Sequence, residues 1–485
     1  MTEMIAVAIL MARDGGTVVK ISRERGFPVS KKPLVLIPIA MAGESVSLFG
    51  LGVGDGRGPA KVFVCGNPIN RDEQYGMLAA AFSAAEPIIL SWEVPLGELP
   101  QIIVTGGDSA RLALGVIDRS VYSQRPNLLR VSRRLAWFDK RSDCADSASV
   151  LVLPKALGAC LATGQDEFGD QHLGAFLEWC APADGRIWQR VAAAEQLSAS
   201  GATPPEFDRE HLAPAVEKYT EALSNGDAPG AARAKKIIAQ LVRDEIDRRY
   251  RLACEGLKQL RLFPEGAVVQ DIAAQDRGAY LEHVGYVADP ANHLRRSLTP
   301  EMQTSEFMSR EFAVERIAGL SIRSVSGAYA KAQLAGELLE GVVVATNRQK
   351  IGRKTIVIQS IRSSQHLSLR SGDKMCLLRD ERFTYRIIDL AECKNSGDML
   401  VRAEVIAGKT LPGLPDIGDA AVLMPPVRDR ATLGRARGIA WDRMRACPTP
   451  VPAAGAIQIV HDLRAPLRHS EANRDGPVFA VGRHH

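Results

Sequence analysis

The segment PQIIVTGGDSARLAL, Pro100–Leu114, decides the fold of the first part of the chain. An apolar run, Gln101–Thr105, leads into two glycines, and apolar residues then recur at the three- and four-residue steps of a helix. The pattern predicts a strand that turns directly into a helix capped by Asp108 or Ser109. The amides of this turn, including that of Gly107, also suit an anion, but capping is the commoner use of such residues and is our interpretation.

Further strands and another helix surround this segment. A helix is expected over Arg71–Ala85. The expected strands are Ile5–Met11, Thr17–Ile21, Leu34–Ala40, Ser45–Phe49, Lys61–Val64 and Ile88–Trp92. The first of these is interpreted as a strand because the apolar run is brief and shows no signal-peptide cleavage site. Strands that alternate with helices favour an open sheet with helical cover, so we predict an α/β domain over residues 1–140.

The pattern changes after residue 140. Helical periodicity dominates residues 141–339 and is strongest from Ala228 to Leu262, which predicts a helical domain. Residues 340–426 alternate with a period of two in several short runs, which favours a small closed β-barrel of the OB or SH3-like kind. Residues 427–485 are rich in Arg and Pro and are expected to form a basic tail. The 485 residues therefore indicate an α+β multidomain protein.

The glycine-rich segment GLGVGDGRG, Gly50–Gly58, has the composition of a phosphate-binding loop. Such a loop needs a helix N-terminus after it, but Pro59 and the strand Lys61–Val64 follow here. The segment also lacks the Gly-Lys-Ser/Thr of an ATP-binding loop. We interpret it as a hairpin connection and expect no nucleotide cofactor.

Glu44, Asp72 and Asp118 are the candidates for metal-dependent phosphodiester cleavage. Two-metal chemistry needs converging carboxylates, normally with one inside the first core strand, and Leu34–Ala40 contains none. Eight cysteines, with no two closer than 16 residues, offer no close pair for zinc. We therefore expect no metal, no cofactor and no catalytic residue, and keep the three carboxylates as an alternative nuclease site.

The positive charge is concentrated towards the end of the chain. There are 61 Lys+Arg and 56 Asp+Glu, a net charge of +5. Residues 340–426 hold 13 basic and 10 acidic residues, and residues 427–485 hold 10 and 5, which leaves residues 1–339 net acidic at −3. The asymmetry predicts an anionic partner for the C-terminal part.

Four of these cations, Arg348, Lys350, Arg353 and Lys354, lie on one expected hairpin, NRQKIGRK. A barrel rim with this charge is suited to follow a phosphate backbone, so we predict a nucleic-acid contact there. A solvated hairpin tip is the simpler alternative, since aromatic residues for base stacking are few in this region.

The composition is that of an ordinary globular protein, with 46% hydrophobic and 24% charged residues. No apolar run reaches the roughly 18 residues that a membrane helix needs, and the best, Pro33–Gly43, is much shorter. We expect no membrane partner and a cytoplasmic location.

Several stretches together resemble a large uncharacterised bacterial family with an N-terminal α/β domain, a helical middle and a C-terminal barrel. The stretches are KPLVLIPIAMAGE (Lys32–Glu44), HLGAFLEWCAPADG (His172–Gly185), FDREHLAPAVEKY (Phe207–Tyr219) and LAGELLEGVVVATNR (Leu334–Arg348). These motifs are apolar and structural, so the resemblance implies domains and no particular site.

The order of elements in residues 34–118 is similar to that of RNase H-like domains accompanying RecB-type nuclease–helicases. The sequence departs from them by lacking the first-strand aspartate, which implies a degenerate, binding-only copy. The expected barrel resembles those inserted in superfamily 1 helicases. Together these likenesses and the charge imply a non-catalytic accessory protein that binds nucleic acid, or a helicase or nuclease partner, in DNA processing or defence against foreign DNA. A metal-dependent nuclease and a protein–protein scaffold stay open as alternatives.

Overall fold

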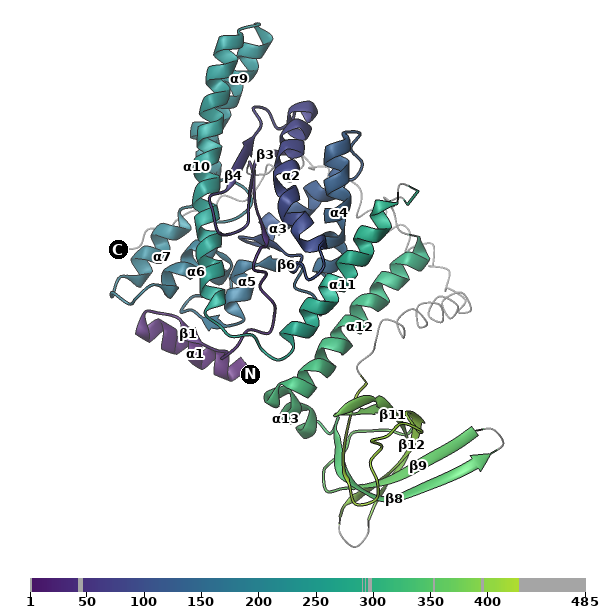
Figure 1. Cartoon of the computed structure of the whole chain (residues 1–485). Helices are drawn as coiled ribbons and strands as arrows, with labels where there is room; N and C mark the ends of the chain where they lie inside the picture. The colour runs from purple at the N-terminus through teal and green to yellow at the C-terminus, as the bar shows by residue number, and fades with distance from the viewer. Residues whose placement is uncertain are drawn as a thin grey trace, which may run out of the picture. The chain divides into compact units, whose positions relative to one another are not determined.

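The computed structural model describes residues 2–41, 47–289, 291–292, 294, 299–351, 354–393 and 397–426 (Figure 1). Contacts divide the chain into Met1–Arg430 and Ala431–His485. The basic tail expected over residues 427–485 therefore lies outside the described residues. Within the described part the protein is mixed α+β, as the sequence predicted.

A five-stranded sheet forms the centre of the first part, in the order β4-β3-β2-β5-β6. Its strands are β2 (Leu34–Ala40), β3 (Leu48–Gly54), β4 (Lys61–Val64), β5 (Ile102–Val104) and β6 (Val150–Val152). The β2–β3 and β3–β4 pairs are antiparallel, whereas β5 is parallel to both β2 and β6. The sheet thus extends past residue 140, where the predicted α/β domain ended. The sequence did not indicate β6 because three residues are too few to show a strand pattern.

Helices cover both faces of this sheet, which explains why every residue of β2 is buried and apolar. Leu34 and Leu36 face a core shared with α2 (Arg71–Glu93), α3 (Gly107–Ser120) and α4 (Pro126–Ser142). Val35 and Ile37 face the opposite core, which includes the long helix α10 (Ala228–Arg261; Figure 1).

Helix α10 reaches the sheet through three glycines of β3. A Cβ at Gly50 would lie 2.5 Å from Val242 Cγ1, and one at Gly52 would lie 2.4 Å from Ile246 Cγ2. A Cβ at Gly54 would likewise overlap the ring of Tyr250, one turn further along α10. Of the predicted connection Gly50–Gly58, the first half, Gly50–Gly54, belongs instead to strand β3, and only the residues after Gly54 join β3 to β4. Gly50, Gly52 and Gly54 leave room for α10, and of the five glycines in this segment only Gly56 has a positive φ, +74°.

Two predicted strands are wrong. Ile5–Met11 lies in helix α1 (Thr2–Gly15), and Ile88–Trp92 lies in the last turns of α2, which continues through Pro87. Both runs are short and apolar, a pattern that a strand shares with a buried helix. In α2 the buried residues keep helical spacing beyond the proline, at Ile88, Ile89 and Trp92.

The remaining elements before residue 339 are mostly helical. They are β1 (Val19–Lys20), α5 (Leu153–Gly158), β7 (Leu161–Ala162), α6 (Leu173–Cys180), α7 (Ile187–Glu195), α8 (Pro205–Phe207), α9 (Ala213–Ser224), α11 (Val269–Ala288), α12 (Pro300–Ser324) and α13 (Ser326–Leu334). Short 3-10 and π turns cover Gly169–Gln171 and Asp208–Leu212. No helix in the described ranges is both long and apolar enough to cross a membrane.

Six antiparallel strands in the later part form a sheet that closes on itself in a ring, in the order β10-β11-β12-β9-β8-β13. They are β8 (Leu339–Ile351), β9 (Lys354–Ser363), β10 (Lys374–Leu377), β11 (Asp380–Glu392), β12 (Met399–Ala407) and β13 (Ala420–Met424). Apolar side chains such as Val343, Val357 and Val405 alternate into a buried centre. The ring accounts for the period-two pattern of residues 340–426.

Candidate nucleic-acid interface

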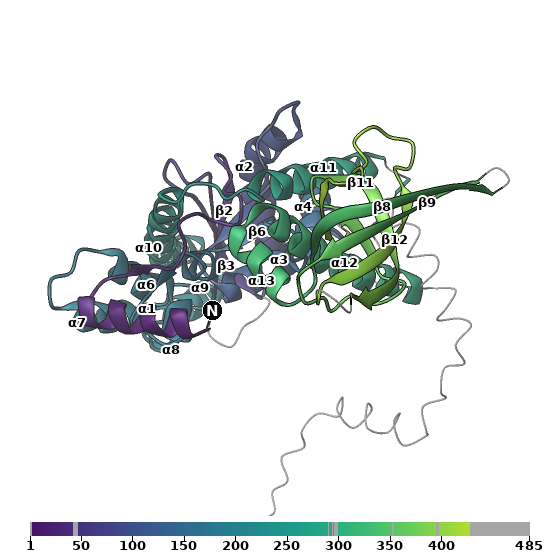
Figure 2. The same ribbon diagram turned by 90° about the horizontal axis from the view of Figure 1, so that it is seen from below.

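Strands β8 and β9 continue beyond the other strands of the ring as a two-stranded ribbon (Figure 2). We call Asn347–Ile351 of β8 and Lys354–Ile358 of β9 the arm. Its residues pair with one another, from Asn347 opposite Ile358 to Ile351 opposite Lys354. Among the described strands, Ile358 is the one arm residue with a second ladder partner, Glu404 of β12. The ladder continues well into the expected hairpin NRQKIGRK, as far as Ile351 opposite Lys354.

Three of the four predicted binding residues belong to this arm. Arg348 and Lys350 are exposed and, two residues apart, project from the same face of β8. Lys354 begins β9 opposite Ile351, while Arg353 lies outside the described residues. The structure thus brings Arg348, Lys350 and the backbone of Lys354 onto one ribbon.

The opposite face of β8 carries amides. Asn347 and Gln349 are exposed and alternate with the two cations, opposite the half-buried Ile358 and Ile356 of β9. Sequence reasoning missed these amides, although the alternation in NRQK, with amide and cation in turn, is a readable signal once the segment is known to be a strand. The arm therefore has one cationic and one amide-bearing face.

Some cations elsewhere in the ring are paired with carboxylates, whereas Arg348 and Lys350 of the arm have no such partner in the described residues. Arg382 pairs with Asp380 at 2.7 Å, and Arg402 of β12 pairs with Asp389 at 3.0 Å. Within the described residues, no carboxylate oxygen lies within 4.0 Å of Arg348 or Lys350. The sequence explains this, because residues 341–372 contain no Asp or Glu. The arm therefore presents uncompensated positive charge to solvent.

Hydrogen bonds join the root of the arm to the ring. Gln359 is fully buried, accepts a hydrogen bond from the Tyr385 hydroxyl at 3.1 Å and donates to the Pro415 carbonyl at 2.6 Å. Lys409 Nζ donates to the carbonyl of Thr355 in the arm itself at 3.0 Å. These contacts attach the root of the ribbon to the ring and were not predicted from the sequence.

The alternative nuclease residues do not form a carboxylate cluster within the described ranges. Asp72 lies in the first turn of α2 with 95% of its side chain exposed and pairs with Arg125 at 3.1 Å. Asp118 is an exposed residue of α3, and Glu44 lies outside the described residues. In the part of the chain that the structure describes, no group of three or more His, Cys, Asp or Glu side chains is placed to hold a metal ion.

The carboxyl ends of β2 and β5, where α/β sheets usually bind ligands, are covered by the loop Ser198–Thr203. Thr203 donates its amide to the Ala40 carbonyl at 2.9 Å, and its hydroxyl donates to the same oxygen at 3.1 Å. Ser200 Oγ accepts the amide of Ser109 at 3.2 Å. We call residues 198–203 the covering loop.

The turn predicted to cap α3 or bind an anion is thus occupied from within the chain. Helix α3 begins at Gly107 after a Gly106 cap, not after Asp108 or Ser109. A Cβ at Gly106 would lie 2.4 Å from Ser200 Oγ, so the covering loop sits directly on this turn. The Ser109 amide donates to a serine hydroxyl instead of an anion.

Arg249 of α10 donates hydrogen bonds to the covering loop. Its guanidinium is fully buried and donates to the carbonyls of Gly201 at 2.7 Å and Ala202 at 3.2 Å. Burial lowers the pKa of Arg249 to about 10, while the nearby Glu245 raises it. A buried cation used in this way ties the loop to the helix beneath the sheet.

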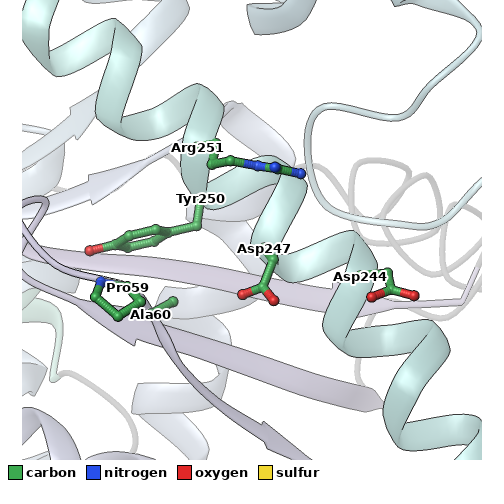
Figure 3. Close-up of a pocket in the computed structure, with 6 residues that line it drawn as sticks. All are labelled: Pro59, Ala60, Asp244, Asp247, Tyr250 and Arg251. Atoms are coloured by element: carbon green, nitrogen blue, oxygen red, sulfur yellow. The ribbon is translucent and has the colours of Figure 1, made fainter.

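An open cleft of about 520 Å³ lies between α10 and the hairpin that joins β3 to β4 (Figure 3). It is lined by Pro59, Ala60, Asp244, Asp247, Tyr250 and Arg251. The carboxylates and the guanidinium project from successive turns of one helix, which is the usual composition of a solvated helix face. The cleft contains none of the residues predicted to bind or react.

Comparison of the chain with protein-family models, curated proteins and solved structures gives no match. The geometry of the arm and of the covered sheet end is therefore the basis on which a function can be proposed.

Proposed function

We propose that this protein is a non-catalytic accessory protein that binds nucleic acid through the arm. One observation carries the proposal: Arg348 and Lys350 are exposed on a two-stranded ribbon, with no carboxylate near them in the described residues. Lys and Arg that neutralise phosphates release counterions, which is the main source of sequence-independent affinity for nucleic acid. A cytoplasmic helicase or nuclease is the proposed protein partner, in DNA processing or defence against foreign DNA.

The fold supports a finer proposal. Three antiparallel strands followed by two parallel ones, in the order β4-β3-β2-β5-β6, suit a degenerate RNase H-like domain. The ring of β8–β13 suits a small barrel of the OB or SH3-like kind. These are likenesses of architecture, and fold alone does not determine function.

The covered sheet end favours binding over catalysis. Leu34–Ala40 supplies no carboxylate, and the space beyond its end is filled by the covering loop on Ser109 and Arg249. A substrate phosphate would have to displace these hydrogen bonds. Each bond lost would leave a buried polar group unpaired, at a cost of about 1–3 kcal/mol.

The test is a fluorescence-anisotropy titration of labelled DNA and RNA over a salt series. In the variant with alanine at Arg348, Lys350, Arg353 and Lys354, we expect weaker binding and a slope of log K against log salt that is shallower by about 0.7–0.9 for each phosphate no longer neutralised. A control variant removes the same charge by alanine substitution of four exposed cations before residue 340, namely Lys61, Arg233, Lys236 and Arg243. An affinity that does not change with salt concentration, or an equal loss of affinity in the two variants, would overturn the arm as the binding site.

The two alternatives are separated by direct assays. Cleavage of labelled DNA or RNA with Mg²⁺ or Mn²⁺ that is abolished by Asp72→Asn would establish a nuclease; we expect no cleavage. Partners retained after nuclease treatment of a pull-down, with no binding of purified nucleic acid, would establish a scaffold.

A further inference from the structure

The shape of the arm limits the nucleic acid that it can bind. Its two strands are joined along their length by the ladder from Asn347–Ile358 to Ile351–Lys354, so each described strand segment has five residues. At about 3.4 Å per residue, such a ribbon is about 17 Å long, and its two backbones lie about 4.8 Å apart. The major groove of B-form DNA, about 12 Å wide and 8.5 Å deep, admits a two-stranded ribbon of this kind.

The residues on the two faces match the two kinds of contact made in that groove. Arg348 and Lys350 supply charge for the phosphates that border the groove, and these contacts fix position without reading sequence. Asn347 and Gln349, on the opposite face, are the side chains whose amides pair best with the N6 and N7 edge of adenine. Half-buried Ile356 and Ile358 beside them offer apolar contact suited to a thymine methyl group.

Other nucleic acids fit the arm less well. Single strands are normally bound on aromatic platforms, and the arm sequence NRQKIGRKTIVI contains no Phe, Tyr or Trp. Duplex RNA has a major groove too deep and narrow for side chains to read. We therefore propose that the arm binds the major groove of duplex DNA, with its amide face towards the base edges and with Arg348 and Lys350 neutralising the phosphates that border the groove. This inference rests on the proposed function.

The experiment compares one sequence as duplex DNA, single-stranded DNA and duplex RNA, with the full chain. We expect the tightest binding to duplex DNA, and displacement by the major-groove dye methyl green but not by the minor-groove ligand netropsin. Equal or tighter binding to single strands or to duplex RNA, or displacement by netropsin alone, would overturn the groove assignment and leave the proposed function standing. Binding to none of the three would overturn both.

Paired variants separate the two faces. Arg348→Ala/Lys350→Ala is expected to lower the salt slope by about two on duplex DNA, from about 0.9 for each phosphate. Asn347→Ala/Gln349→Ala is expected to keep that slope while reducing the preference among duplexes of different sequence about tenfold for each amide removed. Lys61→Ala/Arg243→Ala, which removes two exposed cations elsewhere, should change neither. Loss of sequence preference in the cation variant but not in the amide variant would contradict the assignment of faces.

Discussion

Gly201 shows how single residues close the end of the sheet. It has a positive φ of +62°, and a Cβ there would lie 2.7 Å from Asp108 Cβ. The backbone conformation and the space both require glycine, so the covering loop depends on this residue twice over. Its carbonyl also accepts the hydrogen bond from Arg249.

The variant Gly201→Ala should therefore destabilise the fold by more than the cost of a left-handed alanine, about 1–2 kcal/mol. Gly226→Ala is a matched control, because Gly226 has a similar φ of +69° but a Cβ there would meet no atom within 4 Å. Urea unfolding of both variants measures the difference. Equal destabilisation would mean that the covering loop is not tightly seated on α3.

Asp170 should make stability depend on pH. Its carboxyl accepts a hydrogen bond from the Thr163 hydroxyl, and burial raises its pKa from 3.8 to about 6. Between these values the folded state holds a proton that the unfolded state has lost, so the free energy of unfolding falls as pH rises from about 4 to 6. That fall should be smaller in Asp170→Asn, measured by urea unfolding at several pH values. Asp271→Asn, which changes an exposed carboxylate of α11, is the control, and an unchanged fall in Asp170→Asn would refute the assignment.

At the scale of elements, the contact between β3 and α10 determines how the first part packs. Gly50, Gly52 and Gly54 lie on alternate residues of the strand, so all three face the helix. Val242 and Ile246, one helical turn apart, occupy the space that their missing side chains leave. Close packing of this kind tolerates no extra methyl group without movement.

A double-mutant cycle tests that contact. Gly52→Ala should destabilise by about 1–3 kcal/mol through overpacking, and Ile246→Ala by about 2–5 kcal/mol through a cavity. Together they should cost less than the sum, with a coupling of about 0.5–3 kcal/mol, because the new methyl group enters the vacated space. Gly115→Ala on α3, where a Cβ meets nothing within 4 Å, should show no coupling to Ile246→Ala. Additive effects at Gly52 would contradict the packing.

The sequence predicted strands best where the period was regular. The strands Leu34–Ala40 and Lys61–Val64 are confirmed, and residues 340–426 form several strands as expected, because alternation or an uninterrupted buried run defines them. Helix α1 and the end of α2 were missed because both contain short apolar runs, a pattern that a strand and a helix share. The covering loop could not be predicted, since Ser200 and Ser109 meet only through the tertiary fold.

At the scale of the whole molecule, the charge asymmetry makes a further prediction. Residues 427–485 hold ten basic and five acidic residues, so a chain that ends at residue 426 has a net charge near zero. We expect this shorter chain to bind nucleic acid more weakly at low salt, while alanine at Arg348 and Lys350 still weakens it further. Anisotropy titrations at two salt concentrations measure both effects. If the shorter chain binds nothing while the arm variant of the full chain binds normally, the tail and not the arm is the binding element.

The way the ring closes also has a consequence for synthesis. Strand β13 pairs with both β8 and β10, and Leu423 lies opposite Leu339, far earlier in the chain. The ring therefore cannot close until residue 424 has left the ribosome, and contacts between such distant residues form slowly. Until then β8 and β10 each expose an unpaired edge to other nascent chains. Premature termination before Ala420 should thus yield a product that aggregates, even though the five-stranded sheet is already complete.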